Sequence, residues 1–193
     1  MDLTAGVESV NLITRMKALE SEIAKFEKRE QADLWLRMAR AYFTRVQLAN
    51  KHVLNQVDRC LKNASELNPS NREVAELQFE TGLLRRSEKS LLEALQHTEK
   101  MFGRESDLWK YQRARYLIFN RESIDVAGPE SGELDWIGEV ENLIKEIESI
   151  RPNWHELHAL KGLIARFKNN SDLAIDNFQQ AINSGPMDLR VAK

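Results

Sequence analysis

Cysteine, proline and glycine are scarce in this chain, and each shortage excludes a class of fold. The single cysteine, Cys60, has no partner for an internal disulfide and fits a reducing compartment. Four prolines and eight glycines among 193 residues supply little material for a turn-rich β protein. The chain is instead rich in residues that favour helix, namely Leu, Glu, Lys, Arg and Ala. The composition therefore predicts an all-α protein.

Long apolar runs and an excess of charge of one sign are also missing. No segment approaches the roughly 18 apolar residues of a membrane span, and the polar start does not resemble a signal peptide. The net charge of −2 gives no general argument for nucleic acid or an anionic membrane as a partner. With 30% charged and 42% apolar residues, the chain is predicted to be globular, with the cytoplasm as its default location.

Helical stripes that end at a proline recur along the chain. In "LAIDNFQQAINSGP", Ala174, Phe178 and Ala181 lie four and three residues apart, and Pro186 follows five residues later. Pro152 stands 34 residues before Pro186. The same offsets of four, three and five occur twice more, at Val57, Leu61, Ala64 and Pro69 and at Val140, Ile144, Ile147 and Pro152. This recurrence indicates an internal repeat.

The repeat resembles the tetratricopeptide repeat family, whose unit is a helix–turn–helix of about 34 residues. "DLWLRMARAYF" matches the first-helix pattern of that family, and "LAIDNFQQAINSGP" matches its second-helix pattern and closing proline. The small position of the first helix is occupied by Ala39, Gly82, Ala114 and Gly162. The resemblance implies an all-α fold in which helix pairs stack into a right-handed α-α superhelix, a solenoid.

The resemblance also divides the chain. We expect a capping or partial-repeat helix over 1–30 and the start of a further, truncated helix over 187–193. Four units are predicted between them, over 31–70, 71–105, 106–152 and 153–186, the second of them degenerate and the third with a loop insertion at 120–135. Helices are expected near 5–27, 31–48, 51–67, 71–85, 88–102, 106–119, 135–150, 153–168 and 171–184. Because the end does not read as a polar capping helix, the chain is expected to be a fragment of a longer protein.

No catalytic, cofactor-binding or metal-binding pattern stands out in the sequence. The stretch "HELH" at 155–158 lacks the spacing of the zinc motif H-E-x-x-H, and no third ligand is indicated. No glycine-rich phosphate loop is present. The four tryptophans near the unit starts are interpreted as packing residues: Trp35, Trp109, Trp136 and Trp154. This segment is therefore predicted to be no enzyme and to need no cofactor.

The resemblance implies that the first helices line a concave groove. The groove positions lie three residues before, one after and four after the small residue of each first helix. Here they hold four arginines and four large apolar residues: Arg40, Arg86, Arg115, Arg166, Leu36, Phe43, Phe79 and Tyr111. Arginines interleaved with aromatic rings suit an extended acidic and apolar peptide. The carboxylate clamp of chaperone-binding family members is not carried over, because Leu36 and Arg40 stand where it needs Lys and Asn.

The leading prediction is a noncatalytic protein-interaction module with a protein or peptide partner. Two alternatives keep the fold: an RNA-processing scaffold of half-repeats, and a substrate-recruiting segment of a larger enzyme such as a glycosyltransferase. The first alternative would use a basic cluster within 85–121, which an ordinary solvated face also explains. The cluster consists of Arg85, Arg86, Lys89, Arg104, Lys110, Arg113, Arg115 and Arg121.

Overall fold

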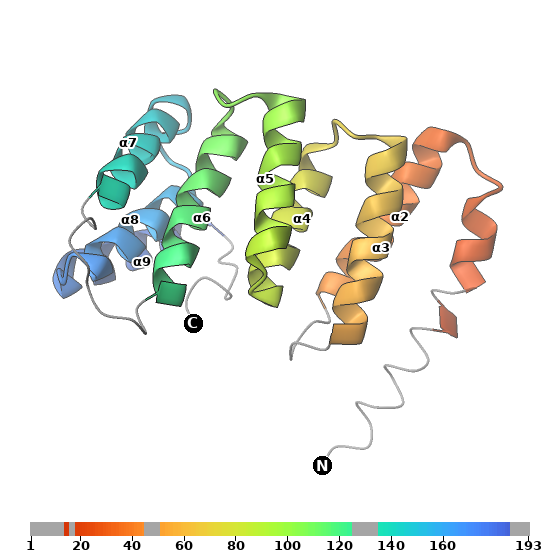
Figure 1. The fold of residues 1–193 in the computed structure, drawn as a ribbon, viewed down its shortest axis with the longest axis horizontal. Helices are drawn as coiled ribbons and strands as arrows, with labels where there is room; N and C mark the ends of the chain where they lie inside the picture. The colour runs from red at the N-terminus through yellow and green to blue at the C-terminus, as the bar shows by residue number, and fades with distance from the viewer. Residues whose placement is uncertain (1–13, 16–17, 45–50, 125–134, 186–193) are drawn as a thin grey trace, which may run out of the picture. The chain divides into compact units, whose positions relative to one another are not determined.

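The structure, a computed structural model, describes residues 14–15, 18–44, 51–124 and 135–185. Within these ranges every regular element is helical (Figure 1). The helices are α2 (Lys28–Phe43), α3 (Lys51–Leu67), α4 (Arg72–Arg85), α5 (Glu88–Phe102), α6 (Asp107–Ile124), α7 (Asp135–Ile150), α8 (His155–Phe167) and α9 (Ser171–Ser184). The predicted all-α class is confirmed for these residues, and consecutive helices pack in pairs. The chain divides into two compact units, Met1–Ala94 and Leu95–Lys193, described separately below.

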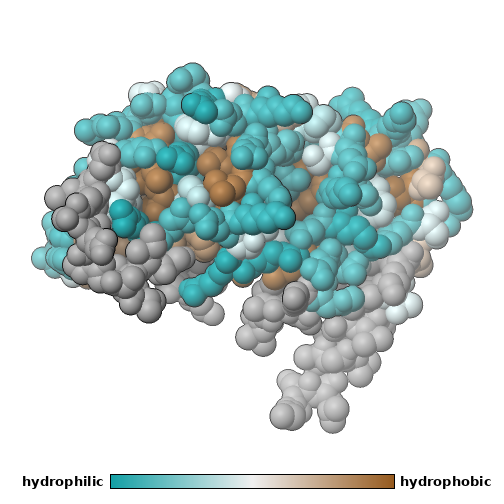
Figure 2. Space-filling model, in the orientation of Figure 1, coloured by the Kyte–Doolittle hydropathy of each residue, from teal (hydrophilic) through white to brown (hydrophobic). Residues whose placement is uncertain are grey.

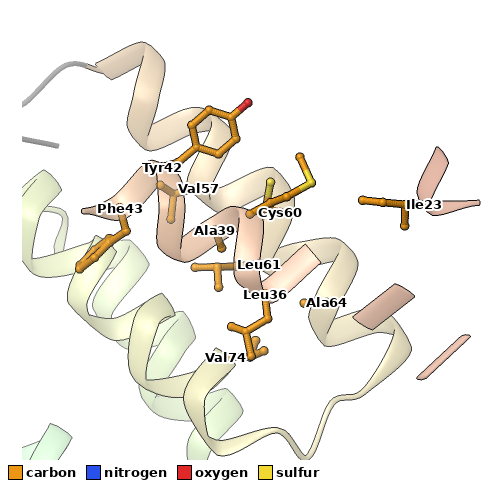
Figure 3. Close-up of a cluster of buried hydrophobic side chains, with 11 residues drawn as sticks. Ile23, Leu36, Ala39, Tyr42, Phe43, Val57, Cys60, Leu61, Ala64 and Val74 are labelled. Carbon is orange, nitrogen blue, oxygen red and sulfur yellow. The ribbon is translucent and has the colours of Figure 1, made fainter. Parts of the chain in front are cut away.

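The first unit is built on the packing of α2 against α3 and of α3 against α4. Its core joins the buried faces of these helices, and Figure 3 shows Cys60, Tyr42 and their neighbours within it. Residues 18–23 are helical as well, and Ile23 is buried in the same core. Glu20 forms an ion pair with Arg59 of α3. The N-terminal helical residues therefore belong to the first unit.

Cys60 is fully buried among these apolar side chains. Burial raises the pKa of its thiol to about 12, because a thiolate would lose its hydration there. A thiol with so high a pKa stays protonated and unreactive at neutral pH, so Cys60 is a packing residue.

The second unit repeats this construction with α6 against α7, α7 against α8, and α8 against α9. The apolar stripe of α7, which includes Val140, Ile144 and Ile147, is buried together with Leu157 and Leu160 of α8. The α7 stripe, one of the three stripes that indicate the repeat, is thus part of the core, as its spacing predicts. No helix among the described residues is both long and apolar enough to cross a bilayer.

Small residues let the helices of one pair approach closely. A Cβ atom added at Gly162 of α8 would lie 2.7 Å from Cε1 of Phe178, so the ring of α9 packs directly on the backbone of α8. At Gly82 of α4 the added atom would lie 3.0 Å from Cδ2 of Leu91. Ala39 and Ala114 at the matching positions are fully buried. The side chain of the second helix occupies the space that a larger residue would fill.

Side-chain caps fix where several helices begin. Asn71 accepts hydrogen bonds from the backbone N–H groups of Glu73 and Val74, at 3.0 and 3.3 Å, so α4 starts at Arg72. Asn170 accepts one from Leu173 at 3.1 Å and starts α9 in the same way. Asn71 follows the closing Pro69, and Asn170 ends the turn before α9. Such signals are visible in the sequence, and most predicted helix starts agree with the structure to within two residues.

Three predicted helix ends are wrong. The helix expected over 31–48 ends at Phe43, with Thr44 as its C-cap. The helix expected over 5–27 stops at residue 23 in the described part, because Lys25 and Phe26 donate backbone hydrogen bonds three residues back, to Glu22 and Ile23, and tighten the chain into a turn. The loop expected over 120–135 starts later, since α6 continues to Ile124. No glycine or proline interrupts residues 120–124. Residues 125–134, and the predicted further helix at 187–193, lie outside the described residues.

Replacing Gly162 with alanine tests the close approach in the second unit. Because Phe178 would have to move away from the new methyl group, Gly162→Ala is expected to lower the free energy of unfolding by about 1–3 kcal/mol. Gly138→Ala in α7 is the matched control, since nothing lies within 4 Å of its added Cβ and alanine favours helix. It should raise stability by up to about 1 kcal/mol. Urea unfolding followed by circular dichroism measures both, and equal effects would contradict the packing account.

Candidate functional site

The apolar half of the predicted groove lies in the core. Leu36, Phe43 and Phe79 of the first unit are 6%, 5% and 1% exposed, and Figure 3 shows Leu36 and Phe43 inside the core cluster. Tyr111 of the second unit is 8% exposed. Side chains so deeply buried have almost no surface to offer a peptide. The expectation that they line an open groove is therefore corrected: they pack between helices.

The four predicted arginines have different surroundings. In the first unit, Arg40 forms a bidentate ion pair with Glu73 of α4, so its guanidinium already joins two helices. Arg86 is exposed and ends α4 in a left-handed conformation with φ 50°. In the second unit, Arg115 is half-buried on α6 and Arg166 is exposed on α8. Each of these two lies against an aromatic ring.

Most of the basic cluster within 85–121 is paired with acidic residues. Arg85 reaches Asp58 at 2.5 Å and Asn55 at 2.9 Å, across from α4 to α3. Other pairs hold Arg104 to Glu99 at 2.7 Å and Arg113 to Glu139 at 2.9 Å. The positive charge of this cluster is therefore largely neutralised by acidic side chains that lie close to it in the folded protein. This pairing removes the observation that favoured an RNA-binding scaffold.

Lys110 is the most buried member of that cluster. Its Nζ lies 2.7 Å from Glu146 of α7 and 3.0 Å from Glu105. The hydrogen bond to Glu146 raises the pKa of Lys110 above its ordinary value of 10.5, and burial opposes the rise without cancelling it. Lys110 thus stays charged and ties α6 to α7.

In two rows on the second unit, a pair of aromatic rings lies between two arginines. In the first row, Arg115 lies 5.5 Å from the ring centroid of Tyr111, the rings of Tyr111 and Trp154 are 4.8 Å apart, and Arg151 lies 4.8 Å from the Trp154 ring. Tyr111 and Arg115 come from α6, whereas Trp154 precedes α8. The first row therefore bridges two helix pairs.

The second row has the same order of side chains. Arg121 of α6 lies 5.9 Å from the ring of Trp136, which meets Phe167 edge-on at 5.1 Å. Arg166 lies 5.7 Å from the Phe167 ring. The three elements that supply these residues are α6, α7 and α8. In both rows an arginine stands at each end and two rings stand between.

This order has a chemical consequence for binding. A guanidinium beside an aromatic ring places a positive charge next to apolar surface, and Arg151 of the first row also pairs with Asp107 at 3.0 Å. The rings of Trp154, Trp136 and Phe167 are half-buried, so each keeps some apolar surface. On the face drawn in Figure 2, brown apolar surface likewise appears as patches between teal polar side chains. The rows therefore combine positive charge with apolar surface.

Sequence reasoning identified only part of these rows. Arg115, Arg166 and Tyr111 were predicted from their repeat positions, whereas Arg151 and Arg121 and the ring-to-ring contacts were not. A local signal was present: Arg151 precedes Trp154 by three residues, and Arg166 is adjacent to Phe167. Among the described ranges, no group of three or more His, Cys, Asp or Glu side chains is arranged to hold a metal ion.

The chain is similar in structure to a known protein, although the comparisons with families and curated proteins found nothing. No family model and no curated protein matches the chain. Among solved structures, the chain is similar to a crystal structure of MamA, with 15% sequence identity and a TM-score of 0.48 over 79% of this chain and 77% of that one. This likeness is too weak to assign the fold. We assign it from the packed helix pairs and from the close contacts at Gly82 and Gly162.

Replacing Lys110 tests the ionic link between α6 and α7. Because the folded-state pKa of Lys110 is raised, its stabilising contribution is complete below about pH 10.5 and is lost as the pH rises through the folded-state value. Lys110→Met should cost about 1 kcal/mol at pH 7, since both glutamates are accessible to water. The difference from the wild type should shrink above pH 11. Urea unfolding at pH 7 and about pH 11.5 measures it, and a constant difference would refute the ionic role.

Proposed function

We propose that this chain is a noncatalytic protein-interaction module that binds an acidic peptide segment with apolar side chains. The observation that carries the proposal is the pair of arginine–ring rows on the second unit. Arg115 and Arg166 stand on the first helices of two consecutive pairs, α6 and α8, each beside a ring. The proposed binding surface consists of these two arginines with the half-buried rings of Trp154 and Phe167.

The geometry favours protein over nucleic acid as the partner. Arg104, Arg113 and Arg151 are paired with Glu99, Glu139 and Asp107, so charges of both signs alternate on the second unit, whereas nucleic-acid binding is marked by a continuous basic stripe. A peptide with spaced carboxylates can approach individual arginines, and its apolar side chains can cover the rings. Binding of moderate affinity is expected, because an extended peptide loses conformational freedom when it is ordered.

Charge reversal at the two arginines tests this function. Arg115→Glu with Arg166→Glu should weaken binding of labelled peptides that alternate Glu or Asp with Leu or Phe by roughly tenfold or more. Fluorescence anisotropy measures binding, and circular dichroism checks that helicity is kept. The matched control is Lys100→Glu with Lys145→Glu, which makes the same change in net charge at exposed positions of α5 and α7.

Two results would reject the proposal. One is equal weakening by the double variant and its control, which would show a general charge effect. The other is binding of single-stranded RNA with a steep salt dependence while no acidic peptide binds, which would restore the nucleic-acid alternative.

A further inference from the structure

The two arginine–ring rows cross the same three helices at opposite ends. The first row lies in the first half of α6, at the end of α7 and at the start of α8. The second row lies near the end of α6, at the start of α7 and at the end of α8. The residues that place the rows are Tyr111, Arg151 and Trp154 for the first and Arg121, Trp136 and Phe167 for the second.

Ion pairs show that α7 runs antiparallel to both of its neighbours. Basic residues of α6 and of the α8 region pair with glutamates of α7 in reversed order along the chain. These pairs are Lys110 with Glu146, Arg113 with Glu139, Lys161 with Glu148 and Lys168 with Glu141. Because the three helices alternate in direction, each row stays at one end of them.

The distance between the two rows follows from the rise of an α-helix. Tyr111 and Arg121 are 10 residues apart in α6, and Trp154 and Phe167 are 13 residues apart along α8. At about 1.5 Å per residue, the rows are separated by about 15–20 Å along the helix axes. An extended peptide advances about 3.3–3.6 Å per residue, so about four to six residues cover this distance.

One row alone is a small target for a peptide. The Tyr111 ring is buried. The other rings of the two rows are half-buried: Trp154, Trp136 and Phe167. A stable protein interface covers about 800 Å² on each partner, far more than these few rings expose. Two such contacts within one peptide strengthen each other, because the first to form holds the second at a high effective concentration.

We propose that the partner segment is bipartite, with two blocks separated by about four to six residues of extended chain. Each block holds one acidic and one large apolar residue on the same side of the chain. The first block places its carboxylate at Arg115 and its apolar side chain on Trp154. The second block uses Arg166 and Phe167 in the same way. This inference rests on the proposed function, whose surface it divides into two subsites.

Ion pairs account for charges outside the two subsites. At the other end of the first row, Arg151 pairs with Asp107 at 3.0 Å, so the protein itself supplies a carboxylate there. Along α7, between the levels of the two rows, Glu148 pairs with Lys161 at 2.6 Å. Because these charges neutralise one another, the residues between the two blocks need the right length and no particular charge.

Three labelled peptides test the spacing. The spaced peptide joins two Glu-Ser-Phe blocks through about three Gly or Ser residues, and the long peptide has a linker of about twelve. The compact peptide has the composition of the spaced one, but its Glu and Phe residues are adjacent. In fluorescence anisotropy, the full chain should bind the spaced peptide roughly tenfold or more tighter than the compact one, which reaches one row only. The long peptide should be intermediate, since effective concentration falls with linker length.

Loss of either subsite should remove this preference. Arg115→Gln alters the first subsite and Arg166→Gln the second, so each single variant should bind the spaced and compact peptides equally. Circular dichroism checks that helicity is kept. The matched control is Lys145→Gln, which removes one positive charge at an exposed position of α7 and should keep the preference for the spaced peptide.

Three results would overturn the inference. Equal binding of the spaced and compact peptides by the wild type would show that one row is enough, and the proposed function would stand. Tightest binding of the long peptide would show that the two contacts lie farther apart than the rows. Failure of the spaced peptide to bind, while the alternating acidic and apolar peptides bind, would reject the two-block motif alone. If neither kind of peptide binds, the proposed function fails as well.

Discussion

The close approach of two helices at a small residue is the constraint on which this structure depends. Phe178 packs on the backbone of α8 only because position 162 has no Cβ atom, and Leu91 packs on Gly82 in a similar way. Two helices in such close contact bury only the side chains between them. Apolar side chains on their other faces must be covered by the neighbouring pair. Leu157 and Leu160 of α8 are accordingly buried with the stripe of α7. Stacking therefore follows from the geometry within one pair.

Charged side chains join the helices that the apolar stripes bring together. Arg40 with Glu73, Arg85 with Asp58, and Lys110 with Glu146 each link one helix to another. The basic cluster within 85–121 was defined by sequence position, and most of its side chains form ion pairs inside the protein. Arginines beside rings also take part in such links: Arg151, 4.8 Å from the centroid of the Trp154 ring, pairs with Asp107 of α6 at 3.0 Å.

Most of the fold could be predicted from the sequence, because helix periods and helix starts are determined by residues close together in the chain. Ala174, Phe178 and Ala181 set the helix period, and Asn71 and Asn170 mark helix starts. The candidate site could be predicted only in part. Repeat positions identify Arg115 and Arg166, but helical periodicity does not separate a groove from an interface between helices, so Leu36 and Phe79 were assigned to the wrong surface. Ring contacts such as Trp136 with Phe167 join distant residues, and no local pattern specifies them.

The central claim is that a helix pair needs its neighbour, and the most direct test is to separate one. A fragment of residues 153–185 contains α8 and α9 but lacks the α7 side chains that cover Leu157 and Leu160. Such a short segment buries too little apolar surface to offset its conformational entropy. Circular dichroism should show the fragment largely unfolded, whereas residues 95–185 should be helical and unfold cooperatively. A fragment that keeps full helicity and melts cooperatively by itself would contradict the account.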